Sequence, residues 1–150
     1  MTLQLKIKKL HPAAVIPKYA TAGAACFDLH AIVENDVSAD AVLPGHFYTF
    51  RTGLAFEVPH GHVLKVFSRS GHGFRYGTRL ANGTGIIDSD YRGELMICLK
   101  NDGPSEPLIV HHGDRIAQAM LVPIPQVELI EVGELSDTER GAGGFGSTGA

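Results

Sequence analysis

Short runs of alternating apolar and polar residues constrain the fold of this chain more than any other feature. Leu3, Leu5 and Ile7 alternate with polar residues, which predicts a half-buried β-strand. Over residues 48–58 most even positions are apolar, with Gly53 at a predicted bulge or bend. Turn residues separate the other predicted strands, which are HVLKVF, GTGII, ELMICL, PLIV, RIAQAMLV and QVELIEV.

This many short strands predict an all-β fold, an antiparallel sandwich, barrel or jelly roll. Only one segment has a helical pattern, about Ser70 to Arg79, and it is short. The length of 150 residues suits one domain. After Leu135 glycine replaces apolar residues, so we expect a β domain over residues 1–138 and a glycine-rich tail over residues 139–150.

The charge balance argues against polyanionic partners. The chain has 13 Lys and Arg against 16 Asp and Glu, a formal net charge of -3. It therefore has no basic surplus for nucleic acid or a membrane surface, and no apolar run approaches the ~20 residues of a membrane span. Cys26 and Cys98 form no CxxC pattern and are expected as reduced thiols in the cytoplasm. A small phosphorylated ligand needs only a few local cations and stays open.

The stretch SRSGHG, residues 68–73, joins an apolar strand to the predicted helix. A Ser-Arg-Ser-Gly turn at a helix start offers free N–H groups, two hydroxyls and a guanidinium, which together suit an anion. The structural alternative is that Ser70 caps the helix and Arg69 is solvated. This stretch alone does not decide between them.

The stretch NGTGIIDSDYRGELMICL, residues 82–99, has two apolar runs around a polar tip, which predicts a β-hairpin. Asp and Ser are common turn formers, so the tip alone indicates no site. Asp88 directly follows Ile86 and Ile87, and a carboxylate at such a strand end could take a proton from water. Spacing does not distinguish Asp88 from Asp90 in this role.

The strand predicted within residues 113–124 places Ile116, Gln118, Met120 and Val122 on one face. A glutamine in an apolar row needs a hydrogen-bond partner, because an unsatisfied buried amide costs ~1–3 kcal/mol. A structural partner is favoured over a ligand. The eight histidines show no zinc-site spacing, and the sequence contains no P-loop or nucleophile-elbow motif.

The stretch RGAGGFGSTG, residues 140–149, is too rich in glycine for a helix or strand, because each glycine inside an element costs roughly 0.5–1 kcal/mol relative to alanine. It nevertheless carries a Phe, an Arg and two hydroxyls. It is either a disordered terminus or a lid that becomes ordered over a ligand.

Five motifs in this order resemble the trimeric dUTPase family, the deoxyuridine triphosphate nucleotidohydrolases. They are PKYATAGAACFDLHA at residues 17–31, RSG at 69–71, NGTGIIDSDYRGEL at 82–95, GDRIAQ at 113–118 and RGAGGFGSTG at 140–149. Each motif is weak alone, but together they span nearly the whole chain. The chain departs from the family pattern with Cys26 in place of Gly, Ser68 in place of Pro and His72 in place of Leu.

The resemblance implies an antiparallel β jelly roll that assembles as a homotrimer with active sites shared between subunits. It implies hydrolysis of dUTP to dUMP and pyrophosphate, which limits uracil in DNA and supplies dUMP for thymidylate synthesis. Asp88 would activate the water that attacks the α-phosphate. The implied cofactor is Mg²⁺ on the triphosphate, and Asp28 would contact it through a metal-bound water, an outer-sphere role that suits an ion that keeps several waters.

The resemblance also assigns substrate contacts. Uracil would be bound by the Asn82 amide and by backbone groups of Gly85, Ile86 and Ile87, in a slot too narrow for the thymine methyl group. Tyr91 would pack under the deoxyribose and exclude a 2′-hydroxyl. Phosphates would be bound by Arg69, Ser70, Gly71 and Gln118. In the tail Phe145 would stack on uracil, Arg140 would bind the γ-phosphate, and Ser147 and Thr148 would add hydroxyl contacts. Met96 and Gly146 complete the implied substrate-binding set.

Two rival functions remain. The dCTP deaminases share the jelly roll but need a catalytic glutamate in the region where this chain has Asp88. A nucleotide-binding module without turnover would share the fold, although Asp88, Arg69 and the tail motif are all present. Product analysis with dUTP and dCTP distinguishes these functions.

Overall fold

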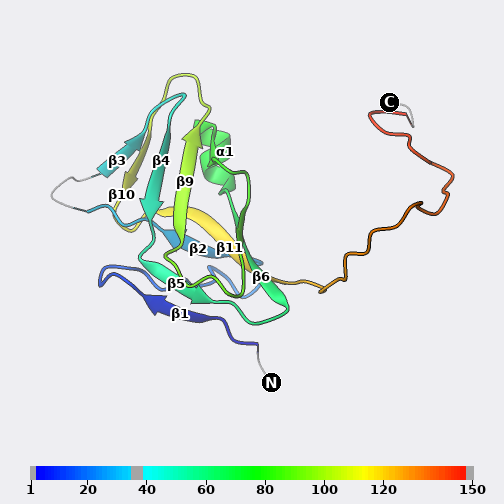
Figure 1. Ribbon diagram of the computed structural model, residues 1–150. Coiled ribbons are helices and arrows are strands. Elements are labelled where there is room, and N and C mark those ends of the chain that lie inside the picture. The colour runs from blue at the N-terminus through cyan, green and yellow to red at the C-terminus, as the bar shows by residue number, and fades with distance from the viewer. Residues whose placement is uncertain (1–2, 35–38, 148–150) are drawn as a thin grey trace.

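The computed structural model describes residues 3–34 and 39–147, and these residues form eleven strands and one short helix (Figure 1). The prediction of an all-β fold with a single short helix is confirmed. In chain order the elements are β1 (Lys6–Lys9), β2 (Phe27–His30), β3 (Ala39–Val42), β4 (Phe47–Arg51), β5 (Leu54–Glu57), β6 (His62–Phe67), α1 (Ser70–Tyr76), β7 (Thr78–Leu80), β8 (Gly85–Ile87), β9 (Met96–Asn101), β10 (Leu108–His111) and β11 (Arg115–Pro123).

The strands form a four-stranded sheet in the order β2-β11-β6-β8, a three-stranded sheet in the order β4-β9-β7, and two ribbons, β1-β5 and β10-β3. Every one of these pairings is antiparallel. One core fills the space between the sheets, with Leu29, Leu64 and Ile116 from the first and Phe50 and Leu99 from the second almost completely buried. This is the predicted jelly-roll architecture.

The β-hairpin predicted over residues 82–99 does not form. β8 pairs with β6, whereas β9 pairs with β4 and β7 in the other sheet. Between the two strands Leu95 is buried, and its N–H donates to the Leu54 carbonyl oxygen at 2.8 Å. The chain therefore crosses from one sheet to the other. The alternating pattern identified the strands, but their partners lie in distant segments that the local pattern does not reveal.

The helix is shorter than predicted, because Gly77 takes the left-handed conformation at φ 65° and ends it. Arg69, not Ser70, is the N-cap residue, and no side chain caps the helix start, so the proposed Ser70 cap is wrong. With seven residues, α1 is far too short to span a membrane, and the described chain holds no other helix that could.

After β11 the described chain continues to residue 147 without a helix or strand, as an arm that extends away from the body (Figure 1). The strand predicted for QVELIEV, residues 126–132, is therefore wrong for the single chain. Val127, Leu129 and Ile130 are 71%, 91% and 70% exposed. A strand needs a second strand for its N–H and C=O groups, and the arm meets none here. The domain boundary at residue 138 stays a prediction.

Candidate active site

The first group of predicted site residues lies where β2, β11 and β6 run side by side. Asp28 on β2 and Phe67 at the end of β6 both pair with Gln118 on β11. The Arg69 Nε atom lies 3.4 Å from Asp28 Oδ1, and Arg115 Nη1 lies 3.3 Å from Asp28 Oδ2. Two guanidinium groups thus flank one carboxylate. The net positive charge of this Asp28 cluster suits a polyphosphate.

Gln118 has the structural partner that the sequence favoured. Its Nε2 atom donates a hydrogen bond to the Ser68 carbonyl oxygen at 2.9 Å. Ser68 Oγ in turn accepts the Leu80 N–H at 2.9 Å, so the serine that replaces the family's proline ties the turn before α1 to β7. The register of β11 against β2 shifts at a bulge between Arg115 and Ala117. Ala117 and Ala119, on the face of β11 opposite Gln118, are completely buried.

Two histidines that the sequence analysis did not assign border this cluster. Burial lowers the pKa of His30, against the opposing effect of the Asp28 carboxylate. Burial and the neighbouring Arg69 guanidinium lower the pKa of His72. The His72 Nε2 atom lies 3.3 Å from Arg69 Nη1, which also donates to the Arg115 carbonyl oxygen at 2.8 Å. Neutral His72 therefore accepts from Arg69 and helps to orient the guanidinium.

The second group surrounds a pocket of about 250 Å³ beside β8. β8 is the edge strand of its sheet, so within the described chain its outer edge presents unpaired backbone N–H and C=O groups. Such a row can bind the edge of a planar base. The pocket is lined by Ile86, Ile87, Asp88, Tyr91, Glu94, Leu95 and Met96.

Most polar predicted site residues are exposed in the single chain. Asp88 is exposed at the end of β8, and Asn82 is exposed in the turn before β8. Ser70 and Gly71 are exposed in the first turn of α1. Tyr91 is 45% exposed.

The third group lies in the tail. The Arg140 Nε atom donates to the Gly143 carbonyl oxygen at 2.8 Å, a local contact. Phe145 has a left-handed backbone at φ 51° and a fully exposed ring, and Gly146 and Ser147 are also exposed. Thr148 lies outside the described residues. Over residues 3–34 and 39–147, no side-chain hydrogen bond or ion pair joins the Asp28 cluster, the Asp88 pocket and the tail.

The donor set of the Asp28 cluster fits a metal ion only in an outer-sphere role. Among the residues that the structure describes, no three His, Cys, Asp or Glu side chains come together as metal ligands. A single carboxylate can accept hydrogen bonds from metal-bound water, and Mg²⁺ usually keeps several of its waters. Asp28 therefore fits a hydrated magnesium ion carried by a polyphosphate ligand.

Comparison with known proteins decides the family, since the family model for dUTPase matches residues 13–149. The chain belongs to the dUTPase family. It is 50% identical over 147 residues to a deoxyuridine 5′-triphosphate nucleotidohydrolase of Nautilia profundicola. The match covers 98% of this chain and 99% of that relative.

Two solved dUTPase structures share the fold of this chain. The Staphylococcus bacteriophage 80alpha dUTPase, solved with dUPNHPP, has a TM-score of 0.83 and 29% identity over 99% of this chain and 100% of its own. A dUTPase mutant of phage phi11 of S. aureus, solved with a structural Mg(II) ion, shares the fold with a TM-score of 0.76 at 24% identity, over 88% of this chain and 98% of its own.

The sequence motifs of this dUTPase assigned no role to three charged residues near the sites, Arg115, Arg51 and Glu94. Arg115 pairs with Asp28, while Arg51 pairs with Glu94 in the wall of the Asp88 pocket. The sequence did offer a signal for Arg115, because it lies inside the GDRIAQ motif, three residues before Gln118 on the same predicted strand. Arg51 and Glu94 are 43 residues apart in the chain, and no local pattern links them.

Proposed function

We propose that this chain hydrolyses dUTP to dUMP and pyrophosphate. The observation that carries the proposal is the pocket beside β8, in which the Asp88 carboxylate stands next to an unpaired strand edge and the Tyr91 ring. The edge supplies directed hydrogen bonds to a base, the ring supplies a wall for a sugar, and the carboxylate supplies a base for proton transfer. Membership of the dUTPase family names the substrate that combines these parts.

In the proposed complex, the backbone groups of Gly85, Ile86 and Ile87 and the amide of Asn82 bind the uracil edge. Gly85 packs tightly on β6, since a Cβ atom there would lie 3.0 Å from Val66 Cβ. This close packing leaves β8 little freedom to move away from the base. A rigid edge can reject a base that carries an extra methyl group by sterics.

The Asp28 cluster binds the phosphates in the proposed complex. Arg69, with Ser70, Gly71 and Gln118, contacts the phosphate oxygens, and Asp28 would hold the magnesium ion of the triphosphate in an outer-sphere role, through water. When bound, Mg²⁺ supplies positive charge that stabilises the phosphate oxygens during attack. Arg69 is held ready for this role by His72 and by the Arg115 carbonyl oxygen.

Asp88 acts as the general base of the proposed reaction. It takes a proton from a water molecule, the water oxygen forms a bond to the α-phosphorus, and the bond to the pyrophosphate leaving group breaks. A positioned base typically contributes ~10²–10⁴-fold to the rate. Most of the remaining acceleration comes from positioning and charge stabilisation by Arg69 and its neighbours.

We further propose a homotrimer with shared active sites. The Asp88 pocket, the Asp28 cluster and the tail are separate in one chain, and the arm carries apolar residues into solvent, among them Leu129 at 91% and Leu135 at 86% exposed. An apolar groove of about 450 Å³ lined by Leu3, Leu5, Ile7 and other residues offers a matching surface. Burying each large side chain gains ~1.5–3 kcal/mol, which supports assembly.

Light scattering tests the assembly, since three chains of 16.0 kDa give ~48 kDa. Mixing Asp88→Asn chains with chains that lack residues 139–150 tests the sharing of sites. If different subunits supply the base and the tail, some mixed sites regain both and activity returns. A monomer, or a mixture without recovered activity, contradicts shared sites.

The substrate test is product analysis with dUTP, dCTP, UTP and dTTP in the presence of Mg²⁺. The proposal expects dUMP and pyrophosphate from dUTP and far slower turnover of the others. Release of ammonia from dCTP would indicate a deaminase, and binding of dUTP without products would indicate a module without turnover. We infer a cytoplasmic location, because Cys26 and Cys98 are both free thiols.

A further inference from the structure

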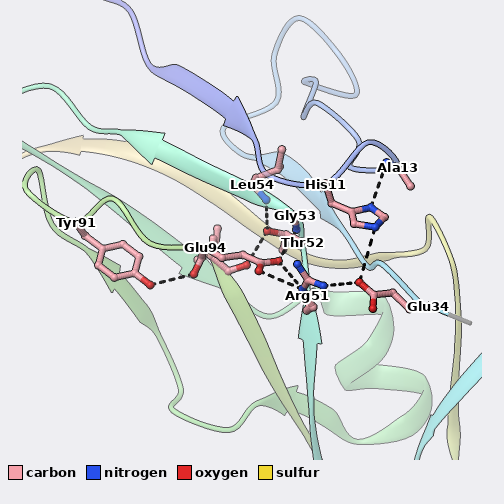
Figure 2. Close-up of polar contacts among 10 residues, drawn as sticks. His11, Ala13, Glu34, Arg51, Thr52, Gly53, Leu54, Tyr91 and Glu94 are labelled. Atoms are coloured by element: carbon pink, nitrogen blue, oxygen red, sulfur yellow. Dashed lines mark hydrogen bonds and ion pairs between the residues drawn. The ribbon is translucent and has the colours of Figure 1, made fainter.

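Hydrogen bonds and an ion pair attach the loop that carries Tyr91 to the bend between β4 and β5 (Figure 2). The Tyr91 hydroxyl donates to the Glu94 carbonyl oxygen at 3.0 Å. The ring lies against Gly93, where a Cβ atom would be 2.3 Å from the Tyr91 Oη atom. The direction of the ring therefore follows the backbone of residues 93 and 94.

The Glu94 carboxylate is the anchor of that backbone. Both of its oxygens lie 3.2 Å from Arg51 Nε, and Oε1 also accepts the Gly53 N–H at 2.8 Å. The carboxylate is only 18% exposed, so these charge-assisted bonds are shielded from water. Leu95 continues the attachment, because its carbonyl oxygen accepts the Thr52 hydroxyl at 2.6 Å.

The bend that holds Glu94 is itself immobilised. Gly53 has φ +66°, and a Cβ atom there would lie 2.5 Å from Ile32 Cδ1. While its Nε atom faces Glu94, the Arg51 guanidinium donates through Nη1 to the Glu34 carboxylate. That carboxylate lies 3.9 Å from His11 Nε2. Arg51 is thus held between two carboxylates (Figure 2).

We propose that Glu94 is a positioning residue that sets sugar discrimination. Held by Arg51 and the Gly53 N–H, it fixes the Tyr91 ring as the wall that excludes a 2′-hydroxyl. The inference rests on the proposed function, in which Tyr91 contacts the deoxyribose. Glu94 lines the pocket but acts through Tyr91, so its loss changes the choice between dUTP and UTP more than the chemical step.

The enzymatic test is the ratio of kcat/KM for dUTP to that for UTP. We expect Glu94→Ala to lower this ratio by about tenfold, because a loosened ring no longer rejects the extra hydroxyl. Glu94→Gln keeps an acceptor for the Gly53 N–H but loses the charge on the Arg51 contact, and it is expected to lower the ratio roughly threefold. If Glu94→Ala fails to fold, Glu94→Gln still tests the proposal.

A double-mutant comparison separates positioning from general damage. Tyr91→Ala removes the wall, so adding Glu94→Ala to it is expected to leave the ratio unchanged. Asp102→Asn is the matched control. It weakens an ion pair of the same kind, between Asp102 Oδ2 and Arg79 Nε at 2.7 Å, outside the loop that carries Tyr91. The proposal is overturned if both Glu94 variants keep the wild-type ratio of kcat/KM for dUTP to that for UTP. It is also overturned if Glu94→Ala lowers this ratio as much in the Tyr91→Ala background as in the wild type.

Hydrogen exchange of the free protein tests the same anchor without nucleotide. Glu94→Ala is expected to speed exchange at the amides of residues 91–95 and 53 relative to wild type and Asp102→Asn. If the wild type does not hydrolyse dUTP, the proposed function fails while this measurement still reports on the anchor. Unchanged exchange at these amides contradicts the anchoring role itself.

Discussion

Replacing Gly93 by alanine moves the Tyr91 ring but changes neither Asp88 nor the phosphate-binding residues. A Cβ atom at residue 93 would lie 2.3 Å from the Tyr91 Oη atom, 2.5 Å from Cζ and 2.9 Å from Cε2, whereas ordinary contact begins at 3.4 Å. The ring must therefore shift by about 1 Å. Tyr91 is 45% exposed, so it has space to do so, and Gly93 has no positive φ that would forbid alanine.

The expected cost in stability is small, whereas the cost in function is large. The shift breaks the hydrogen bond from Tyr91 to the Glu94 carbonyl oxygen, which is worth about 1 kcal/mol, or roughly 2–4 °C in Tm for a chain of this size. A misplacement of ~1 Å in an active site can cost up to ~10²-fold in rate. We expect Gly93→Ala to lower kcat/KM for dUTP by ~10- to 10²-fold and to reduce the preference for dUTP over UTP.

The assay is steady-state turnover of dUTP and UTP together with a thermal melt. Gly133→Ala is the matched control, because a Cβ atom at residue 133 meets nothing within 4 Å. A Gly93→Ala protein with the wild-type ratio of dUTP to UTP turnover would refute the role of Tyr91 as the sugar wall.

Three further predictions concern the tail and the phosphate site. Deleting residues 139–150 is expected to leave Tm and assembly unchanged but to lower kcat/KM by about 10²-fold or more, because it removes the Phe145 stack and the Arg140 contact. Protease nicking near Arg140 is expected to be fast in the free protein and slow with a non-hydrolysable dUTP analogue and Mg²⁺; full activity of the truncated chain, or nicking that ignores the analogue, contradicts a lid. For His72, burial and Arg69 lower the pKa below the usual 6.5 while Asp114 opposes them, so the native state binds protons less readily than the unfolded chain. Stability is therefore expected to fall as the pH drops below about 6.5, and less so in His72→Leu than in a His60→Gln control; equal slopes in thermal melts would exclude His72 as a source.

The strands were predictable where burial is local. HVLKVF gave β6 with its observed bounds, because Val63, Leu64 and Val66 are buried in a short run between turn residues. The pairing of strands was not predictable in the same way. β8 and β9 are neighbours in the chain, but the burial of Leu95 in the core sends β9 to the other sheet.

Partners outside the local pattern explain the other differences. Val127, Leu129 and Ile130 have the spacing of a strand, but a strand also requires a partner, which the single chain does not supply. For the site, the motifs identified Asp88, Arg69 and Asp28 as candidates, and their roles stay predictions. The anchor between Arg51 and Glu94 depends on a contact between distant segments, so only the folded chain reveals it.

The most direct test of the central claim compares Asp88→Asn with the wild type. Asparagine keeps the shape of the side chain but cannot accept a proton from water at neutral pH. With dUTP and Mg²⁺, the wild type is expected to release dUMP and pyrophosphate, and the variant is expected to bind dUTP with nearly unchanged affinity while turning it over ~10²-fold or more slowly. Equal turnover by the variant, or no product from the wild type, would contradict the account.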